Sequence, residues 1–306
     1  MLKKIREIPN FLNFLKFEPL GIPAFLCAAS SIVLLFLMLF FIAREGIQAF
    51  LTLGGELVIG TIWETNAGFY GGLPLIYGSL IVVAIALLIA VPLGVAASIF
   101  ISEVLPFSLR DPVKSIIELL ASIPSVIYGF IGLLFIAPQV AALFGLSSGT
   151  VALTASIVLA IMAVPTIVGV AGETIAAVPK EYKEAALALG ATKWETIKSV
   201  VIPAAKSGIL ASILLGFGRA IGETVAVLMV AGNVAVIPSP PWNILSPVYT
   251  LTGVIAMQMG EAAVGSLEYS ALFGLGLILF VITFIVNTLA DIVVSREKAK
   301  IKGAKR

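Results

Sequence analysis

Long apolar runs dominate the chain and are separated by short polar segments. The runs lie near residues 22–43, 73–101, 117–143, 151–171, 208–231 and 270–294. A helix needs about 20 mostly apolar residues to cross the hydrocarbon core of a bilayer. The pattern therefore predicts an all-α integral membrane protein with six transmembrane helices. The shorter stretch 251–265 is predicted to form either a loop or a partial, re-entrant helix.

The composition agrees with this assignment and removes several classes of chemistry. Hydrophobic residues make up 60% of the 306 residues, charged residues 12%, and the mean hydropathy is +1.13, which is incompatible with a soluble globular domain. The chain has no histidine and one cysteine. A metal site built on imidazole or thiolate ligands is therefore excluded, and we expect no metal or other cofactor in this chain.

Basic residues mark one side of the membrane. Of the 19 Lys and Arg residues, all but Arg44 and Arg219 fall in the N-terminal tail, the C-terminal tail and the loops after the second and fourth apolar runs. Lys and Arg next to helix ends are retained in the cytoplasm. Both termini of this multi-pass membrane protein are therefore predicted to be cytoplasmic.

This topology divides the chain into five parts. They are a cytoplasmic tail at 1–21, a first transmembrane anchor at 22–43, an external segment at 44–72, a transmembrane domain at 73–294 with a long cytoplasmic loop at 173–207, and a basic cytoplasmic tail at 295–306.

The third apolar run contains a proline flanked by small polar residues. In "ELLASIPSVIYGF", Ser122 and Ser125 lie on either side of Pro124, with Gly129 a turn later. Proline removes a backbone donor and bends or breaks a helix. We expect a kink at Pro124, which either is purely structural or faces a transport pathway.

The loop at 173–207 is predicted to fold into two short helices. Pro179 suits the first position of one helix, and Gly190 suits the left-handed residue that ends it. Thr192 and Glu195 have the spacing of a capping box that starts the second helix. The two helices form a knuckle whose small apolar face, which includes Ala185, Ala186 and Leu189, suits a docking partner.

This knuckle resembles the cytoplasmic loop of the permease subunits of ABC importers. The residues that match the spacing of that family are Glu184, Ala185, Ala186, Gly190, Val200, Ile202 and Pro203. The resemblance implies a type I ABC importer permease-like core whose knuckle couples to an ATPase. No Gly-Lys dipeptide occurs, so a phosphate-binding Walker A loop is absent and ATP should be bound by a separate ATPase subunit.

The fifth apolar run carries the charges Arg219 and Glu223. On a continuous helix these two residues share a stripe with Ser212 and Gly216. An arginine inside the bilayer is costly and needs an inward-facing partner. Glu223, four residues on, is either a purely structural ion partner of Arg219 or part of a substrate path. In a path, the guanidinium would bind an oxyanion, and Ser212 and Gly216 would leave room beside it.

"GFGRAIGETVAVLMVAGN" and "ELLASIPSVIYGF" are similar to segments of phosphate-importer permeases of the PstC type. This resemblance implies phosphate as the substrate, with Arg219 and Glu223 on its path, and a location in the plasma (inner) membrane of a prokaryote. It also implies a second, PstA-like permease, an ATP-binding cassette ATPase dimer and an external phosphate-binding protein as partners. The alternatives are an ABC permease for another oxyanion, such as sulfate or molybdate, and a stand-alone secondary transporter or channel. No loop brings together a set of catalytic residues, so we expect no enzymatic activity in this chain.

Overall fold

The computed structural model describes residues 21–303, so the predictions for residues 1–20 and 304–306 lie outside the described part of the chain. The described chain is almost entirely helical, with one two-stranded hairpin. Its elements are α2 (Gly21–Leu53), α3 (Glu56–Ile59), β1 (Trp63–Glu64), the 3₁₀ turn η1 (Thr65–Ala67), β2 (Phe69–Tyr70), α4 (Leu73–Ile99), the π-helical turn η2 (Phe100–Val104), α5 (Phe107–Ser122), α6 (Ser125–Ile131), the π-helical turn η3 (Gly132–Ile136), α7 (Ala137–Phe144), α8 (Ala152–Ala176), α9 (Lys180–Ala188), α10 (Lys193–Thr196), the π-helical turn η4 (Ile197–Val201), α11 (Ile202–Ile221), α12 (Val225–Val230), α13 (Leu251–Gln258) and α14 (Leu267–Gly303).

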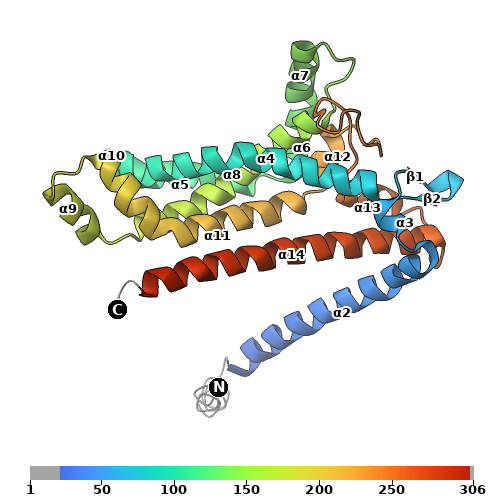
Figure 1. Cartoon of the computed structure of the whole chain (residues 1–306), viewed down its shortest axis with the longest axis horizontal. Helices are drawn as coiled ribbons and strands as arrows, with labels where there is room; N and C mark the ends of the chain where they lie inside the picture. The colour runs from blue at the N-terminus through green and yellow to red at the C-terminus, as the bar shows by residue number, and fades with distance from the viewer. Residues whose placement is uncertain (1–20, 304–306) are drawn as a thin grey trace.

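The described residues contain six helical segments that are long and apolar enough to span a membrane, as the hydrophobic pattern predicts. Four of them, α4, α8, α11 and α14, run along the long axis of the molecule (Figure 1). α9 and α10 lie at one end of this axis, whereas α3, β1, β2 and α13 lie at the other. The N-terminal end of α2 and the C-terminal end of α14 both point toward the end that carries α9.

The first and last helices are longer than the apolar runs that predicted them. Residues 44–53, expected in an external segment, continue α2 because its face packs against α14. There Ala49 is fully buried, and a side chain at Gly46 would meet the carbonyl oxygen of Phe273. At the other end of the chain, residues 295–303 of the predicted basic tail form the last turns of α14.

The predicted third helix, 117–143, is wrong as a single span. The amphipathic α5 ends at Ser122, and the membrane-spanning segment Ser125–Phe144 begins after the break. Ile123 between them is extended, with ψ 130°. A residue before proline is pushed toward this conformation by the proline ring, and Pro124 supplies no backbone donor to the helix. Proline thus breaks this helix completely.

The predicted fifth helix, 208–231, is wrong at both ends. Its helical rod already starts at Lys193 and runs through α10, η4 and α11 to Ile221. The second helix of the predicted knuckle is therefore the beginning of a spanning helix. At the far end, residues 222–224 leave the helical path before α12 begins at Val225. Arg219 and Glu223 consequently do not lie on one continuous helix.

The stretch 251–265 contains the short helix α13, which confirms a partial helix. Leu251 and Val254 on α13 are fully buried. The buried hydroxyl of Ser79 on α4 accepts a hydrogen bond of 2.8 Å from the backbone N–H of Leu251. On the same end of the molecule, the indole N–H of Trp63 donates to the side-chain oxygen of Gln258 at 3.0 Å. These contacts tie α13 to α4 and to the hairpin.

The core of the molecule is built on α8, which packs between α4 and α11. Small residues bring the three helices close together. Ile167 of α8 is fully buried and faces Gly94 of α4 and Gly216 of α11. A Cβ atom at either glycine would lie 2.8 Å from a side-chain carbon of Ile167. The side chain of Ile167 therefore fills the space that both glycines leave open.

We predict that Gly216→Ala destabilises the protein in detergent, because overpacking a filled core site costs about 1–3 kcal/mol. Gly169→Ala is the matched control, since no neighbouring atom lies within 4 Å of the Cβ position at Gly169. Thermal unfolding of the purified variants measures both changes. The penalty of Gly216→Ala should shrink in an Ile167→Ala background. An equal penalty in both backgrounds would contradict the packing assigned to Ile167.

Candidate functional site

Arg219 holds together three helices near the middle of the molecule. Its guanidinium donates to the carbonyl oxygen of Ala121 on α5 at 3.2 Å and to the hydroxyl of Thr166 on α8 at 3.4 Å. The side chain is only half-buried. A carbonyl in the last turn of a helix attracts a cation because the helix dipole is negative there. Arg219 is thus positioned by backbone as well as by side chains.

The expected ion pair between Arg219 and Glu223 is not formed among the described residues, where the salt bridges are Arg44 with Glu45 and Lys183 with Glu103. A carboxylate of Glu223 instead accepts the backbone N–H of Ala226 at 3.1 Å, which caps α12. The carbonyl of Glu223 accepts the hydroxyl of Thr252 at 3.1 Å. The prediction assumed a continuous helix, and the turn at 222–224 removes the required spacing.

Ser212 and Gly216 do not leave room beside Arg219 in this structure. The hydroxyl of Ser212 is fully buried and donates to the carbonyl of Ile209 at 2.7 Å. Gly216 faces the side chain of Ile167. Gly216 therefore serves the contact between α11 and α8 in this conformation, and the hydroxyl of Ser212 is satisfied within α11.

An open hollow of about 600 Å³ instead lies beside Arg219, between α11 and α14. No neighbouring atom lies within 4 Å of the Cβ position at Gly218, which also lines the hollow. The hollow is lined by Ala211, Leu214, Leu215, Gly218, Arg219, Asn287, Asp291 and Val294. Asn287 and Asp291 were missed in the sequence analysis, although two polar residues four apart in an apolar run place both on one helix face. Glu223 lines a separate, tight pocket with Ser79, Thr250 and Thr252.

At Pro124, where a kink was predicted, the helix breaks, and the break supplies the acceptor for Arg219. Because the helix stops at Ser122, the carbonyls of its last turn have no next turn to bind. Ala121 accepts from Arg219, and Leu120 accepts the hydroxyl of Tyr128 at 2.8 Å. The hydroxyl of Ser122 donates back to Leu119 at 2.7 Å, and Ser125 is the first residue of α6.

The knuckle contains the predicted turns. Gly190 has φ +90°. Its N–H donates to Leu187 at 3.0 Å, and the N–H of Ala191 donates to Ala186 at 3.1 Å, which together form a Schellman motif at the end of α9. The capping box of Thr192 and Glu195 is present. Pro179, predicted at the first helical position, is instead the N-cap, so α9 begins one residue later, at Lys180.

The knuckle presents apolar side chains at its surface. Glu184 and Ala185 on α9 are exposed, Ala186 is half-buried, and Pro203 is exposed in the first turn of α11. Leu189 is 89% exposed, and Trp194 is 63% exposed. Such exposed apolar groups on a rigid corner are typical of a protein contact.

Comparisons with known proteins agree with this architecture. A family model described as binding-protein-dependent transport system inner membrane component matches residues 90–299. A probable ABC transporter permease protein, YqgH, of Bacillus subtilis is 38% identical over 277 residues, which cover 89% of this chain and 89% of that protein. The phosphate transport system permease protein PstC of Mesorhizobium japonicum is 39% identical over 272 residues, which cover 83% of this chain and 82% of that protein.

A solved structure supports the same fold. A chain in the crystal structure of a bacterial alginate ABC transporter, in complex with an alginate pentasaccharide-bound periplasmic protein, superimposes with a TM-score of 0.64 at 16% identity. The superposition covers 92% of this chain and 97% of that chain. At this identity the likeness concerns the fold alone. The matched family model and the two similar proteins cover most of the chain, which therefore belongs to the family of binding-protein-dependent transport system inner membrane components.

Proposed function

We propose that this chain is the permease subunit of an ATP-driven importer that moves inorganic phosphate into the cell. The chain is a multi-pass inner membrane protein of a family whose members transport substrates delivered by binding proteins. Phosphate is favoured because relatives that are 37–39% identical over more than four fifths of this chain are named phosphate transport permeases. The observation that carries the chemistry is the half-buried guanidinium of Arg219 at an open hollow.

The guanidinium of Arg219 is suited to bind an oxyanion that loses its hydration shell inside the membrane. Guanidinium has five N–H donors and remains charged, so it compensates the desolvation of the anion and binds two of its oxygens at once. Two of these donors are held by Ala121 and Thr166, which fix the orientation of the group. Asn287 offers further polar atoms at the same hollow. Glu223 acts from its own pocket, where its carboxylate accepts the backbone N–H of Ala226 at the start of α12.

The proposed partners bind at the two ends of the molecule and beside it in the membrane. We assign the knuckle to the cytoplasm, where its surface docks on one subunit of an ATPase dimer that binds and hydrolyses ATP. A second, PstA-like permease pairs with this chain in the membrane. An external phosphate-binding protein docks at the opposite end, which carries α3, the β1–β2 hairpin and α13 (Figure 1). This chain is the transport subunit and carries out no chemical step.

The alternatives make different demands on the same groups. A permease for sulfate or molybdate would use Arg219 equally, because guanidinium binds any of these oxyanions. A stand-alone secondary transporter or channel would offer no role for the capped, apolar knuckle. Competition by these anions and dependence on ATP therefore distinguish the three functions.

We predict that the knuckle faces the cytoplasm. In a Cys27→Ala background, which removes the one native cysteine, Leu189→Cys should react with an impermeant thiol reagent in inside-out vesicles and stay unlabelled in intact cells. The chain is expressed without the ATPase, so that the knuckle is free. Ser239→Cys, also at an exposed residue, should show the reverse labelling. Labelling of Leu189→Cys in intact cells would overturn the assigned orientation.

We predict that Gly190→Val and Glu184→Lys uncouple the permease from its ATPase while leaving it inserted. A β-branched residue in the left-handed conformation of Gly190 costs about 1–2 kcal/mol. Glu184→Lys reverses an exposed charge on the proposed docking surface. Copurification of the ATPase and ATP-driven uptake report both effects. Normal copurification together with normal uptake would remove the residue concerned from the docking surface.

We predict that Arg219 and Glu223 differ in their mutational effects. In vesicles that contain the whole importer, phosphate uptake by the wild type should need both ATP and the binding protein. Arg219→Gln should lower uptake by roughly a hundredfold or more, because truncating a buried charge leaves the anion unpaired. Glu223→Gln should lower phosphate uptake less than Arg219→Gln does, because the amide oxygen of the glutamine still accepts the backbone N–H of Ala226.

Thr166→Val is the matched control for Arg219→Gln, since it removes one acceptor and keeps the guanidinium. It should reduce uptake only slightly. Assembly is measured for all three variants by copurification of the subunits. Normal phosphate uptake by an assembled Arg219→Gln complex would show that Arg219 is a packing residue outside the path.

A further inference from the structure

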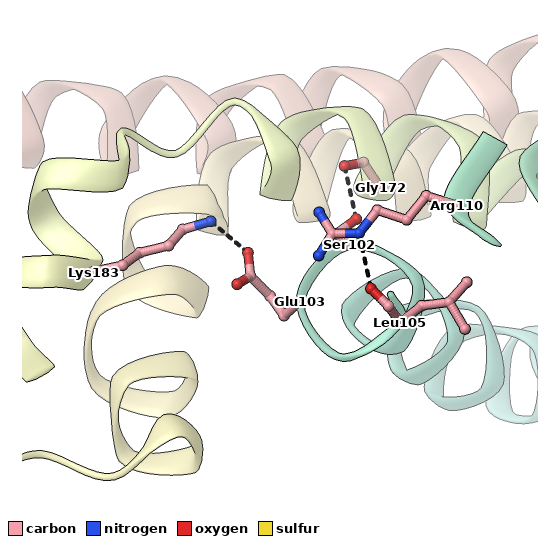
Figure 2. Close-up of polar contacts among 6 residues, drawn as sticks. All are labelled: Ser102, Glu103, Leu105, Arg110, Gly172 and Lys183. Carbon is pink, nitrogen blue, oxygen red and sulfur yellow. Dashed lines mark hydrogen bonds and ion pairs between the residues drawn. The ribbon is translucent and has the colours of Figure 1, made fainter. Parts of the chain in front are cut away.

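An ion pair attaches the knuckle to the spanning helices. The ammonium group of Lys183 on α9 lies 2.6 Å from a carboxylate oxygen of Glu103 in η2, at the end of α4 (Figure 2). The side chains are 20% and 11% exposed. Charges so far removed from water need their partner, and the pair is strong only while its geometry is kept. None of the nine residues of α9, all of which the structure describes, is buried. Apolar burial therefore contributes little to holding α9.

Glu103 lies in an irregular turn at the end of α4. η2 is a π-helical turn, which inserts an extra residue into the helix and is typical of functional sites. Its neighbour Ser102 is buried and donates to the carbonyl of Gly172 on α8 at 3.1 Å (Figure 2). Two successive residues of η2 thus bind α8 and α9.

The corner between η2 and α5 is connected to Arg219 through α5. The guanidinium of Arg110 in α5 donates to the carbonyl of Leu105 at 3.0 Å, which closes the turn between η2 and α5 (Figure 2). α5 has 16 residues and is about 24 Å long at 1.5 Å per residue. The far end of α5 presents the carbonyl of Ala121 to Arg219. A displacement of the corner therefore moves the group that holds Arg219.

We propose that the Lys183–Glu103 ion pair is a strut that transmits movement of the knuckle to the corner between η2 and α5, and along α5 to the carbonyl that positions Arg219. This proposal rests on the proposed docking of the knuckle on an ATPase. Lys183 and Glu103 are positioning residues, since neither touches the hollow beside Arg219. Movement driven by ATP at the knuckle would then change the orientation of the anion-binding guanidinium.

The test exchanges the two charges in the complete importer. Lys183→Glu and Glu103→Lys should each lower phosphate uptake about tenfold, within the range of coupling between partners in one ion pair. ATP hydrolysis and subunit assembly should persist, so that more ATP is used per phosphate. The double exchange Lys183→Glu with Glu103→Lys should recover most of the uptake. Lys198→Glu, the same charge change at an exposed residue of η4, outside α9 and α10, should behave as the wild type.

A second readout follows the hollow itself. In the Cys27→Ala background, Gly218→Cys places a thiol in the hollow at a site without close neighbours. With the strut intact, ATP should change its rate of labelling. That change should disappear in Lys183→Glu and return in the double exchange.

The outcomes separate the two proposals. A wild-type complex without ATP-driven phosphate uptake would refute the proposed function and the strut together. Wild-type uptake with normal uptake by both single variants would refute the strut alone. The strut is also refuted if the single variants only reduce the amount of complex, with normal uptake per ATP and normal ATP-dependent labelling in what assembles.

Discussion

A helix that breaks leaves the carbonyl groups of its last turn without partners inside the helix, and lipid cannot supply them. The break at Pro124 leaves such carbonyl groups, and two side chains of the site bind them. Tyr128 donates to the carbonyl of Leu120, and Arg219 donates to that of Ala121. One requirement therefore fixes three features together: the end of α5, the approach of α11 to α5, and the orientation of the guanidinium. The cost of placing an arginine in the membrane is offset by acceptors that a continuous helix would have used itself.

The sequence predicts the spans well and their interruptions unevenly. Length and hydropathy are local properties, so all six spans were located. Pro124 predicts the break at 123–124, because a proline ring disfavours the helical conformation of the residue before it. The break at 222–224 has no such signal, since glycine is common inside transmembrane helices. The turn there contacts a distant segment, since Thr252 donates to the carbonyl of Glu223 from 29 positions along the chain.

In the candidate site, too, the features that depend on neighbouring residues were predicted, and those that depend on distant residues were not. The caps at Gly190 and Thr192 were predictable because each is completed by residues within one turn. The rule that an intramembrane charge needs a partner drew attention to Arg219. Its partner was assigned wrongly, because a carbonyl acceptor such as Ala121 leaves no side-chain pattern in the sequence. The i, i+4 spacing favoured Glu223 only as long as the helix was assumed to continue.

The hollow beside Arg219 has a consequence for assembly. Arg219, Asn287 and Asp291 line a space of about 600 Å³ that opens between α11 and α14. Polar and ionisable groups at membrane depth face protein or water rather than lipid, because burial of an unpaired charge in hydrocarbon costs several kcal/mol. A single copy of this chain leaves these groups open to its surroundings. The proposed companion permease would cover them, and the anion would then pass between two permeases. On this view the charge that binds the substrate also favours the pairing, since the surface that carries Arg219 is suited to the membrane only when another protein completes it.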